Sequence, residues 1–217
     1  MLEFHNVKVY DLKESVIASR NAMRLDMPEY TDEEFEKGLE RAIKLAKAGG
    51  GSGHSSFRKG IRVSFDMKYT QYITKQFQRY NWFDYITSSS LMHRITRMDF
   101  SNCVNKYVSQ ETIDKMTRLI NLYNKFVEER TEEYVFELRK ETIHAKTHKD
   151  VVYTQFMIII SECPMGTELF VRISTNYEQL ATIYKQRKNH KLKEDYAAFV
   201  KMVQELPYSK ELILCEE

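Results

Sequence analysis

Cysteine and long apolar runs are scarce in this sequence. Its 217 residues include only three cysteines, Cys103, Cys163 and Cys215, which lie far apart and form no CxxC pair. A disulfide framework and a structural zinc site are therefore disfavoured, and we expect a reducing, cytoplasmic setting. The longest apolar run, Phe156–Ile160, is too short to cross a bilayer. The N-terminal residues are charged from position 3 and do not resemble a signal peptide, so we expect a soluble protein with no membrane partner.

An excess of charge of one sign is also missing, as are the motifs of several enzyme classes. The 33 Lys and Arg residues exceed the 31 Asp and Glu residues by only two, whereas a surface that coats nucleic acid is usually far more basic. We therefore expect no nucleic-acid partner, and a binder acting through the basic segment Lys185–Lys193 is disfavoured. The chain has neither an HExxH motif nor a GxSxG elbow, so we expect no metal site and no serine nucleophile.

What remains is the ordinary composition of a globular protein, with 42% apolar and 29% charged residues. The length suits a single α+β domain spanning residues 1–217. Alternation of apolar and polar residues predicts strands at Val7–Tyr10, Arg62–Met67 and Glu168–Ser174. Helical periodicity predicts helices at Glu14–Met23, Tyr69–Tyr85, Ser109–Lys140, Val151–Ile160 (buried), Tyr177–Arg187 and Glu194–Glu205.

A further helix has a recognisable start and stop. Thr31 is placed to cap its N-terminus, and Glu34 has the reciprocal capping-box spacing. The helix then continues to about Ala48, where the run Gly49–Gly53 ends it.

The residues after this glycine run carry polar side chains. The segment Gly49–Phe57 reads GGGSGHSSF, and a glycine-rich turn presents backbone N–H groups to a phosphate. His54, Ser55 and Ser56 would add side-chain donors. A helix cap followed by a flexible loop fits the same pattern, and no Gly-Lys-Ser/Thr closes it as in a P-loop.

A second polar segment extends from Gln76 to Arg94. Gln76 and Arg79 are three residues apart, so they share one face of the predicted helix. The segment then reaches three consecutive serines, Ser88, Ser89 and Ser90. Hydroxyl groups beside a guanidinium commonly bind phosphate, and a solvated arginine in a polar loop is the alternative. We expect this segment to help build a site for a small nucleotide.

Asn176 and Arg187 form a third candidate pair. They are eleven residues apart, close to three helical turns, so both are expected to point the same way. The cations of Arg187–Lys191 lie at the expected end of that helix, where they are also favourable for the helix dipole alone.

Taken in order, these segments resemble the flavin-dependent thymidylate synthase family over most of the chain. Glu14–Arg20 matches the family's first helix, and Gly53–Ser56 matches its Gly-His-x-Ser/Thr motif. Gln76–Arg79 matches its Gln-x-x-Arg motif. Pro164–Thr167, with Asn176 and Arg187, matches its closing strand–helix segment. The segments Arg187–Lys191 and Leu206–Ser209 resemble a divergent branch found in bacteria and their viruses.

The family's signature, Arg-His-Arg-x-x-Ser-x-Asn-Glu-x-Ser-x-Arg-Tyr, is only partly kept. Arg79 matches its first arginine, but Tyr80 and Asn81 replace the His-Arg that touches flavin in the family. Thr87 replaces its glutamate on the nucleotide side, and Arg94 would supply the later arginine if the loop is longer.

The resemblance implies an α+β fold with an antiparallel or mixed sheet flanked by long helices. It also implies a homotetramer with shared active sites, FAD as cofactor, and NADPH and methylenetetrahydrofolate as co-substrates for methylation of dUMP at C5. Arg187 would be the catalytic residue, because it would orient the uracil and stabilise negative charge on its ring. The nucleotide would be held by Gln76, Arg79, Ser88, Ser89, Ser90, Arg94 and Arg187. FAD would contact His54, Ser55, Ser56, Arg79, Tyr80, Asn81, Asn176 and His190.

Two alternatives to dUMP methylation stay open at this point. One is a relative that modifies a different pyrimidine. The other is a non-catalytic homologue that binds a nucleotide and has lost the flavin chemistry.

Overall fold

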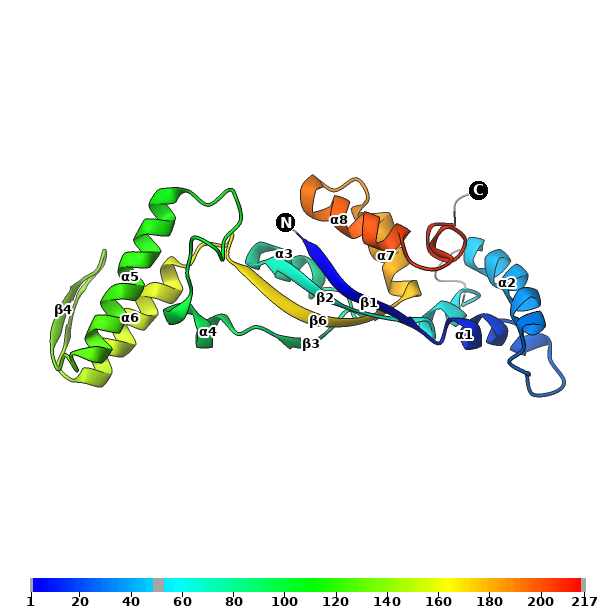
Figure 1. Cartoon of the computed structure of the whole chain (residues 1–217), viewed down its shortest axis with the longest axis horizontal. Coiled ribbons are helices and arrows are strands. Elements are labelled where there is room, and N and C mark those ends of the chain that lie inside the picture. Colours follow the sequence, from blue (N-terminus) through cyan, green and yellow to red (C-terminus); the bar gives the residue numbers. More distant parts are fainter. Residues whose placement is uncertain (1, 49–52, 216–217) are drawn as a thin grey trace. The chain divides into compact units, whose positions relative to one another are not determined.

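The computed structural model describes residues 2–48 and 53–215, which fold into two compact units (Figure 1). Unit 1 contains the chain up to Tyr69, the segment Ile73–Ser88, and the chain from Phe170 onward. Unit 2 contains Thr70–Tyr72 and Ser89–Leu169. The predicted single domain spanning residues 1–217 stays a prediction.

Unit 1 is built on a four-stranded sheet. Its strand order is β1 (Glu3–Tyr10), β2 (Arg62–Thr70), β6 (Glu168–Asn176) and β3 (Asp84–Ser88). The pairs β1–β2 and β3–β6 are both antiparallel. On β2 the side chains of Val63, Phe65 and Met67 are fully buried and alternate with more exposed polar neighbours, which confirms the period-two interpretation of this segment.

Helices lie on one side of this sheet (Figure 1). They are α3 (Gln71–Phe77), α7 (Tyr177–Arg187) and α8 (Lys193–Gln204). Aromatic rings fill the space beneath them, and Phe77 stacks on Phe83 with ring centroids 4.7 Å apart. Phe199 and Tyr196 also contact Phe77. Helix α7 packs against α8, and its last residue, Arg187, contacts Tyr196 of this aromatic core.

Two further helices of unit 1, α1 (Leu12–Ala18) and α2 (Asp32–Lys47), pack against each other. They meet at Gly38, where an added Cβ would lie 2.8 Å from the carbonyl oxygen of Val16. Only glycine permits so close an approach of the two backbones. The short helices η2 (Ser56–Lys59) and η4 (Lys210–Leu214) also pack on this part of unit 1, and η1 (Asn21–Met23) follows α1.

The cap predicted for α2 is confirmed in its first half. Thr31 Oγ1 accepts a hydrogen bond from the backbone N–H of Glu34 at 3.2 Å, as an N-cap should. The Glu34 carboxylate binds Arg20 and Arg24. Of the glycine run that follows, residues 49–52 lie outside the described residues, and Gly53 has a φ of 76°.

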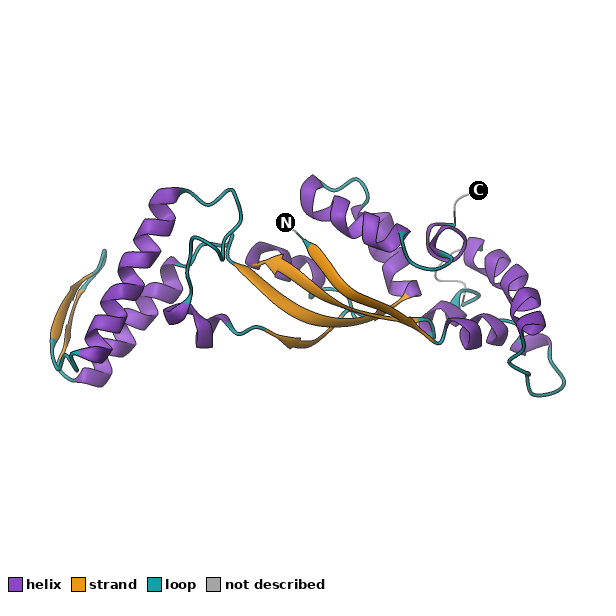
Figure 2. Ribbon diagram, viewed as in Figure 1, coloured by secondary structure: helices purple, strands orange, loops and turns teal. Residues whose placement is uncertain are grey.

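Unit 2 is a helix pair with a hairpin (Figure 2). The helices α5 (Gln110–Glu128) and α6 (His148–Glu162) lie side by side, and the strands β4 (Tyr134–Glu137) and β5 (Thr142–Ala145) pair antiparallel. The short α4 (Leu91–Arg94) and η3 (Ile95–Arg97) precede α5. Two apolar clusters form the core, one centred on Phe100, Met116 and Ile159 and the other on Phe126 and Phe136.

The structure corrects three predicted helices. The helix expected at Tyr69–Tyr85 ends at Phe77, and Asp84–Ser88 pairs with β6 as a strand. The helix expected at Ser109–Lys140 stops at Glu128, because Arg130 adopts a φ of 49° and the chain turns into the hairpin. The helix expected at Glu14–Met23 ends at Ala18.

The remaining helices and strands are confirmed, with boundaries shifted by a few residues. The helix at Tyr177–Arg187 has the predicted bounds. The prediction that the helix at Val151–Ile160 is buried is partly wrong, since Tyr153 of α6 is 63% exposed. The α+β class with antiparallel pairing is confirmed. Within residues 2–48 and 53–215, none of the helices combines the length and the apolarity needed to cross a membrane.

Candidate functional site

Arg187, the last residue of α7, is a buried cation in an aromatic setting. Its side chain is 7% exposed, and its Nε donates a hydrogen bond to Tyr80 Oη at 2.9 Å. The guanidinium carbon lies 5.8 Å from the ring centre of Tyr80 and 5.3 Å from that of Tyr196. Among the described residues no carboxylate forms an ion pair with it, and neither terminal amino group makes a hydrogen bond. These two groups are therefore available to a ligand.

Tyr80 holds this arginine in place from the turn after α3. Its hydroxyl accepts the hydrogen bond from Arg187 and donates one to Gln186 Oε1 at 2.9 Å. A phenol that satisfies both bonds fixes the plane of the guanidinium. Tyr80 stands where the family has histidine, and in this chain its hydroxyl is thus bound to Arg187.

Tyr196 and His190 complete the surroundings of Arg187. Burial raises the pKa of Tyr196 to about 12, and its hydroxyl has no hydrogen-bond partner in the described part of the chain. The His190 ring contacts the Tyr196 ring edge-on at 4.6 Å. Burial, reinforced by the charges of Arg187 and Lys191, lowers the pKa of His190, which favours the neutral imidazole.

Gln76 and Arg79 do not share a helix face as predicted. Gln76 lies on α3, whereas Arg79 is exposed in the turn beyond the last helical residue, Phe77. The turn forms because Tyr80 N–H bonds to the Phe77 carbonyl at 3.0 Å. Asn81 is exposed in the same turn.

The predicted serines belong to different elements. Ser88 ends β3 opposite Val171 in unit 1. Ser89, Ser90 and Arg94 belong to unit 2, where Ser90 caps α4 by accepting the N–H of His93 at 3.3 Å. Their predicted contact with a nucleotide phosphate stays a prediction.

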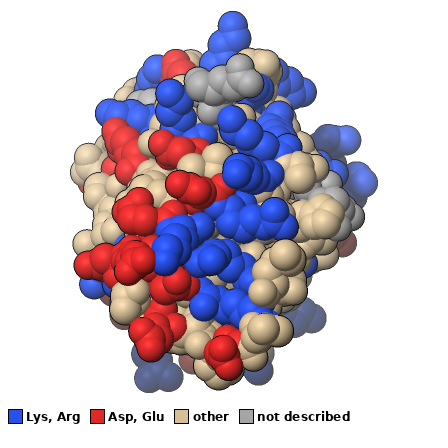
Figure 3. All heavy atoms as spheres, turned by 90° about the vertical axis from the view of Figure 1, so that its right-hand side faces the viewer, with Lys and Arg blue, Asp and Glu red and all other residues tan. Residues whose placement is uncertain are grey.

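His54 and Ser56 line a pocket of about 460 Å³ in unit 1. Arg41 of α2 and Ser15 and Ser19 from the region of α1 also line it. Figure 3 shows the face on the right of Figure 1, where Lys and Arg form a band beside a group of Asp and Glu. Hydroxyls together with an arginine and a histidine suit a phosphate-bearing ligand, and the contact of His54 and Ser56 with FAD stays a prediction.

Ser55 and Asn176 have structural partners. Ser55 is buried, and its Oγ donates to Glu178 Oε1 at 3.1 Å. Asn176 caps α7, because its Oδ1 accepts the N–H of Gln179 at 2.9 Å. The amide nitrogen of Asn176 is the part of that side chain left for a ligand.

A buried ion pair connects distant segments of unit 1. The Arg58 side chain is 2% exposed, and its Nε and Nη2 each lie 2.6 Å from Glu178 Oε2. Its Nη1 donates to the carbonyl oxygen of Leu212 at 3.1 Å. This arrangement gives each nitrogen of the arginine a partner and points to a structural role.

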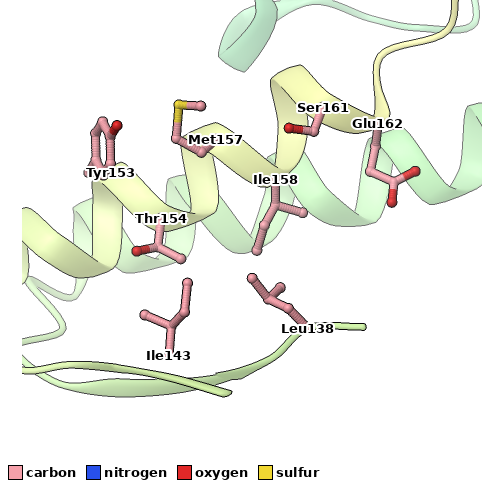
Figure 4. Close-up of a pocket in the computed structure, with 8 residues that line it drawn as sticks. All are labelled: Leu138, Ile143, Tyr153, Thr154, Met157, Ile158, Ser161 and Glu162. Atoms are coloured by element: carbon pink, nitrogen blue, oxygen red, sulfur yellow. The ribbon is translucent and has the colours of Figure 1, made fainter. Parts of the chain in front are cut away.

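Unit 2 contains a pocket of a different kind. About 370 Å³ of space lies between the hairpin residues Leu138 and Ile143 and the α6 residues Thr154 and Ile158 (Figure 4). Its only charged lining residue, Glu162, pairs with Lys115 at 2.6 Å. The lining thus offers no cation to a phosphate. No group of three or more potential metal ligands occurs among residues 2–48 and 53–215.

Sequence reasoning missed Tyr196 and Arg41. Tyr196 follows Arg187 by nine residues across a loop, so no helical or strand period relates them. Arg41 lies on the polar side of α2, where a charged residue normally indicates only solvation. The residues that flank these two positions therefore do not indicate that either one belongs to the site.

Comparison with known proteins gives a likeness of fold. No protein-family model matches the sequence, and no curated protein matches it significantly. The structure matches the flavin-dependent thymidylate synthase ThyX from Helicobacter pylori complexed with FAD and dUMP, with a TM-score of 0.64 at 14% identity, covering 99% of this chain and 100% of that one. A second structure of that enzyme with FAD and dUMP matches with a TM-score of 0.58 at 13% identity, covering 99% of each chain.

A third match is the UMP/dUMP methylase PolB from Streptomyces cacaoi bound with 5-Br dUMP. Its TM-score is 0.53 at 10% identity, and the match covers 94% of this chain and 89% of that one. The chain therefore has the fold of the flavin-dependent thymidylate synthases, and the resemblance indicated by the sequence motifs is confirmed at the level of the fold.

Proposed function

We propose that this protein is a flavin-dependent enzyme that transfers one carbon to C5 of a pyrimidine deoxynucleotide. The substrate would be dUMP and the product dTMP, with methylenetetrahydrofolate as carbon donor and NADPH as reductant. The fold supports the proposal, since the similar structures are described as complexes with FAD and dUMP or with a dUMP analogue.

The observation that carries the proposal is the state of Arg187. A buried guanidinium that is accompanied by aromatic rings and by no carboxylate keeps its charge available to an anionic ligand. Tyr80 occupies its Nε and leaves its terminal amino groups for a ligand. A uracil ring gains negative charge as its C5 becomes nucleophilic, and donors held in advance at that position lower the barrier.

The residues around the His54 pocket fit a flavin nucleotide. FAD would carry the hydride when bound. His54 and Ser56 would contact it, because they offer donors in a pocket that Arg41 also lines. The amide nitrogen of Asn176, which lines a separate pocket with Arg62 and Trp82, would be a further contact, as the resemblance implies. The neutral imidazole of His190 would avoid adding charge beside Arg187.

The nucleotide contacts and the assembly belong to the same proposal. Gln76, Arg79 and Ser88 to Ser90, with Arg94, would hold the phosphate and sugar of dUMP. The protein would be a homotetramer with active sites shared between subunits, as the resemblance implies. Light scattering of the purified chain tests the assembly, and a monomeric mass at micromolar concentration would contradict it.

One experiment tests the enzyme directly. The purified protein is titrated with FAD and then incubated with dUMP tritiated at C5, NADPH and methylenetetrahydrofolate. We expect a flavin absorption band that stays with the protein through gel filtration, and release of tritium to water that requires FAD. Absence of tritium release from a flavin-loaded, dUMP-binding protein would rule out this reaction.

A second candidate function is a nucleotide-binding protein without flavin chemistry. Tyr80 favours it, because the hydroxyl at the family's histidine position is bound to Arg187 and Gln186, and Asn81 removes the next cation. Protein that binds dUMP but retains no flavin absorption after gel filtration from excess FAD would support this function. Tritium release from cytidylate or UMP in place of dUMP would instead indicate a relative with a different pyrimidine.

A further inference from the structure

The pocket of unit 2 between α6 and the β4–β5 hairpin has no role in the proposed function. Its volume of about 370 Å³ falls within the range of about 300–1,000 Å³ that is typical of small-molecule sites. All the residues that line it belong to unit 2, so the pocket is formed within one compact unit. None of them is assigned above to the nucleotide or to FAD.

Apolar side chains form most of the wall of this pocket. Leu138 and Ile143 come from the hairpin and its turn, and Met157 and Ile158 come from α6 (Figure 4). Three of the four, all except Met157, also pack against the apolar cluster centred on Phe126, which fixes their positions. Met157 is unbranched and can adapt its shape to a ligand. This wall suits the apolar body of a small molecule.

Thr154 adds a hydroxyl without a partner to this wall. The residue is 9% exposed, and its side chain lies on the side of α6 that faces the hairpin (Figure 4). A threonine in a helix can donate to the carbonyl four residues earlier, as Thr117 of α5 does to Ile113 at 2.9 Å. Among the described residues, the Thr154 hydroxyl forms neither this bond nor any other hydrogen bond. A hydroxyl so deeply buried is unfavourable unless a ligand bonds to it.

The lining of the pocket carries little charge. Its single charged residue is Glu162, which pairs with Lys115 while both side chains remain nearly half exposed. An anionic ligand would lose its hydration and would meet a carboxylate in place of a cation. The lining therefore favours a neutral ligand.

We propose that this pocket binds a neutral, largely apolar small molecule that carries one hydroxyl group. The apolar body would contact Leu138, Ile143 and Ile158. The ligand hydroxyl would bond to Thr154 Oγ1, which can both donate and accept. The inference is independent of the proposed function, because it uses no residue assigned to the pyrimidine or to the flavin.

The test is titration of the full chain with three molecules that share one ring system, namely 1-naphthol, naphthalene and 1-naphthoate. The methyl resonances of Ile143, Met157 and Ile158 in ¹H–¹³C NMR spectra locate the binding and give the affinities. We expect 1-naphthol to bind and to shift these resonances. Naphthalene should bind about 5-fold more weakly, because it lacks the hydrogen bond, and 1-naphthoate should bind more weakly than 1-naphthol because of its charge.

Three results of these titrations would overturn the proposal. They are absence of 1-naphthol binding up to its solubility limit, binding that leaves all three methyl resonances unchanged, and binding of 1-naphthoate that equals binding of 1-naphthol.

A matched pair of threonine variants tests the hydroxyl contact. Thr154→Val removes the hydroxyl and keeps the shape of the side chain. We expect its affinity for 1-naphthol to fall by about 5-fold, with its affinity for naphthalene unchanged. Thr117→Val is the control, since that hydroxyl bonds to Ile113 and does not line the pocket. Equal affinity of Thr154→Val and the unaltered chain for 1-naphthol would overturn the proposal.

A second copy of this chain is the alternative occupant of the wall, because Tyr153 and Met157 are 63% and 39% exposed. Light scattering with and without saturating 1-naphthol separates the two. We expect the mass of the protein to stay the same. A lower mass in the presence of 1-naphthol would show that another copy fills the pocket and would overturn the proposal.

Discussion

At the scale of single residues, Arg187 is matched by aromatic rings where a carboxylate would be usual. The ring centres of Tyr80 and Tyr196 lie 5.8 Å and 5.3 Å from its guanidinium carbon, and Tyr80 also accepts a hydrogen bond from its Nε. A carboxylate would neutralise the arginine and compete with an anionic ligand. Rings stabilise the cation and leave its charge effective toward the ligand.

Substitution at this pair should affect turnover more than folding. We expect Arg187→Ala to lower kcat by about 100-fold or more, as loss of one preorganised donor does. Tyr80→Phe keeps the ring and removes the hydroxyl, so we expect a fall in kcat/KM of about 10-fold. Steady-state kinetics with dUMP measures both. The exposed Tyr153→Phe serves as control, and unchanged turnover in Arg187→Ala would remove the catalytic assignment.

The buried phenol of Tyr196 should make stability depend on alkaline pH. Burial raises its pKa from 10.0 to about 12, so between these values the unfolded chain loses a proton that the folded protein keeps. The unfolded state then binds fewer protons, and the free energy of unfolding falls as the pH rises through this range. Urea unfolding at pH 8 and at pH 10.5 measures the decrease. Tyr196→Phe should show a smaller decrease than Tyr153→Phe, and equal decreases would contradict the role of burial.

At the scale of elements, α7 connects two parts of the candidate site. Asn176 caps its N-terminus, and Arg187 ends it eleven residues later. The cap gives Asn176 a structural role in addition to the proposed contact with flavin. These two roles use different atoms of one amide, the oxygen for the cap and the nitrogen for the ligand.

Substitutions at Asn176 separate the two roles. Asn176→Ala should lower the free energy of unfolding by about 1 kcal/mol through loss of the cap. Asn176→Ser and Asn176→Asp keep a capping oxygen and lack the amide nitrogen, so both should retain most of the stability while binding FAD more weakly. Urea unfolding and flavin titration give the two readouts. Full flavin affinity in both conservative variants would show that Asn176 acts only as the helix cap.

The helices and strands also show how much of the fold can be predicted from the sequence. Helix α7 has its predicted bounds because an asparagine cap, an apolar stripe and terminal cations all agree locally. The chain around Tyr85 was predicted as helix because its local pattern permits one, yet pairing with β6 makes Asp84–Ser88 a strand. Pairing across 80 or more residues is absent from any local pattern. The position of Arg187 at the end of α7 was therefore predictable, whereas its contact with Tyr196 across the loop was not.

At the scale of the whole molecule, a buried arginine joins segments from three parts of the chain in unit 1. Arg58 binds Glu178 at the start of α7 and the carbonyl of Leu212 in η4. Glu178 also accepts from Ser55. The C-terminal residues are thus connected to the loop that carries His54.

Removing this arginine should destabilise the protein strongly. We expect Arg58→Ala to cost about 3–5 kcal/mol, because it leaves Glu178 partly buried without its partner. Arg172→Ala at the more exposed pair with Asp66, whose side chains are 30% and 41% exposed, is the control and should cost less than about 1 kcal/mol. Urea unfolding compares them, and similar losses in the two variants would contradict the structural role of Arg58.

The close crossing of α1 and α2 has a consequence for ligands. The helices touch backbone to backbone at Gly38, and the same region supplies Ser15, Arg41 and Leu45 to the pocket that His54 lines. The width of that pocket is therefore set by a residue that does not line it. A methyl group at position 38 would push the two helices apart. It would thereby alter which ligands the pocket admits, although every side chain that lines the pocket stays the same.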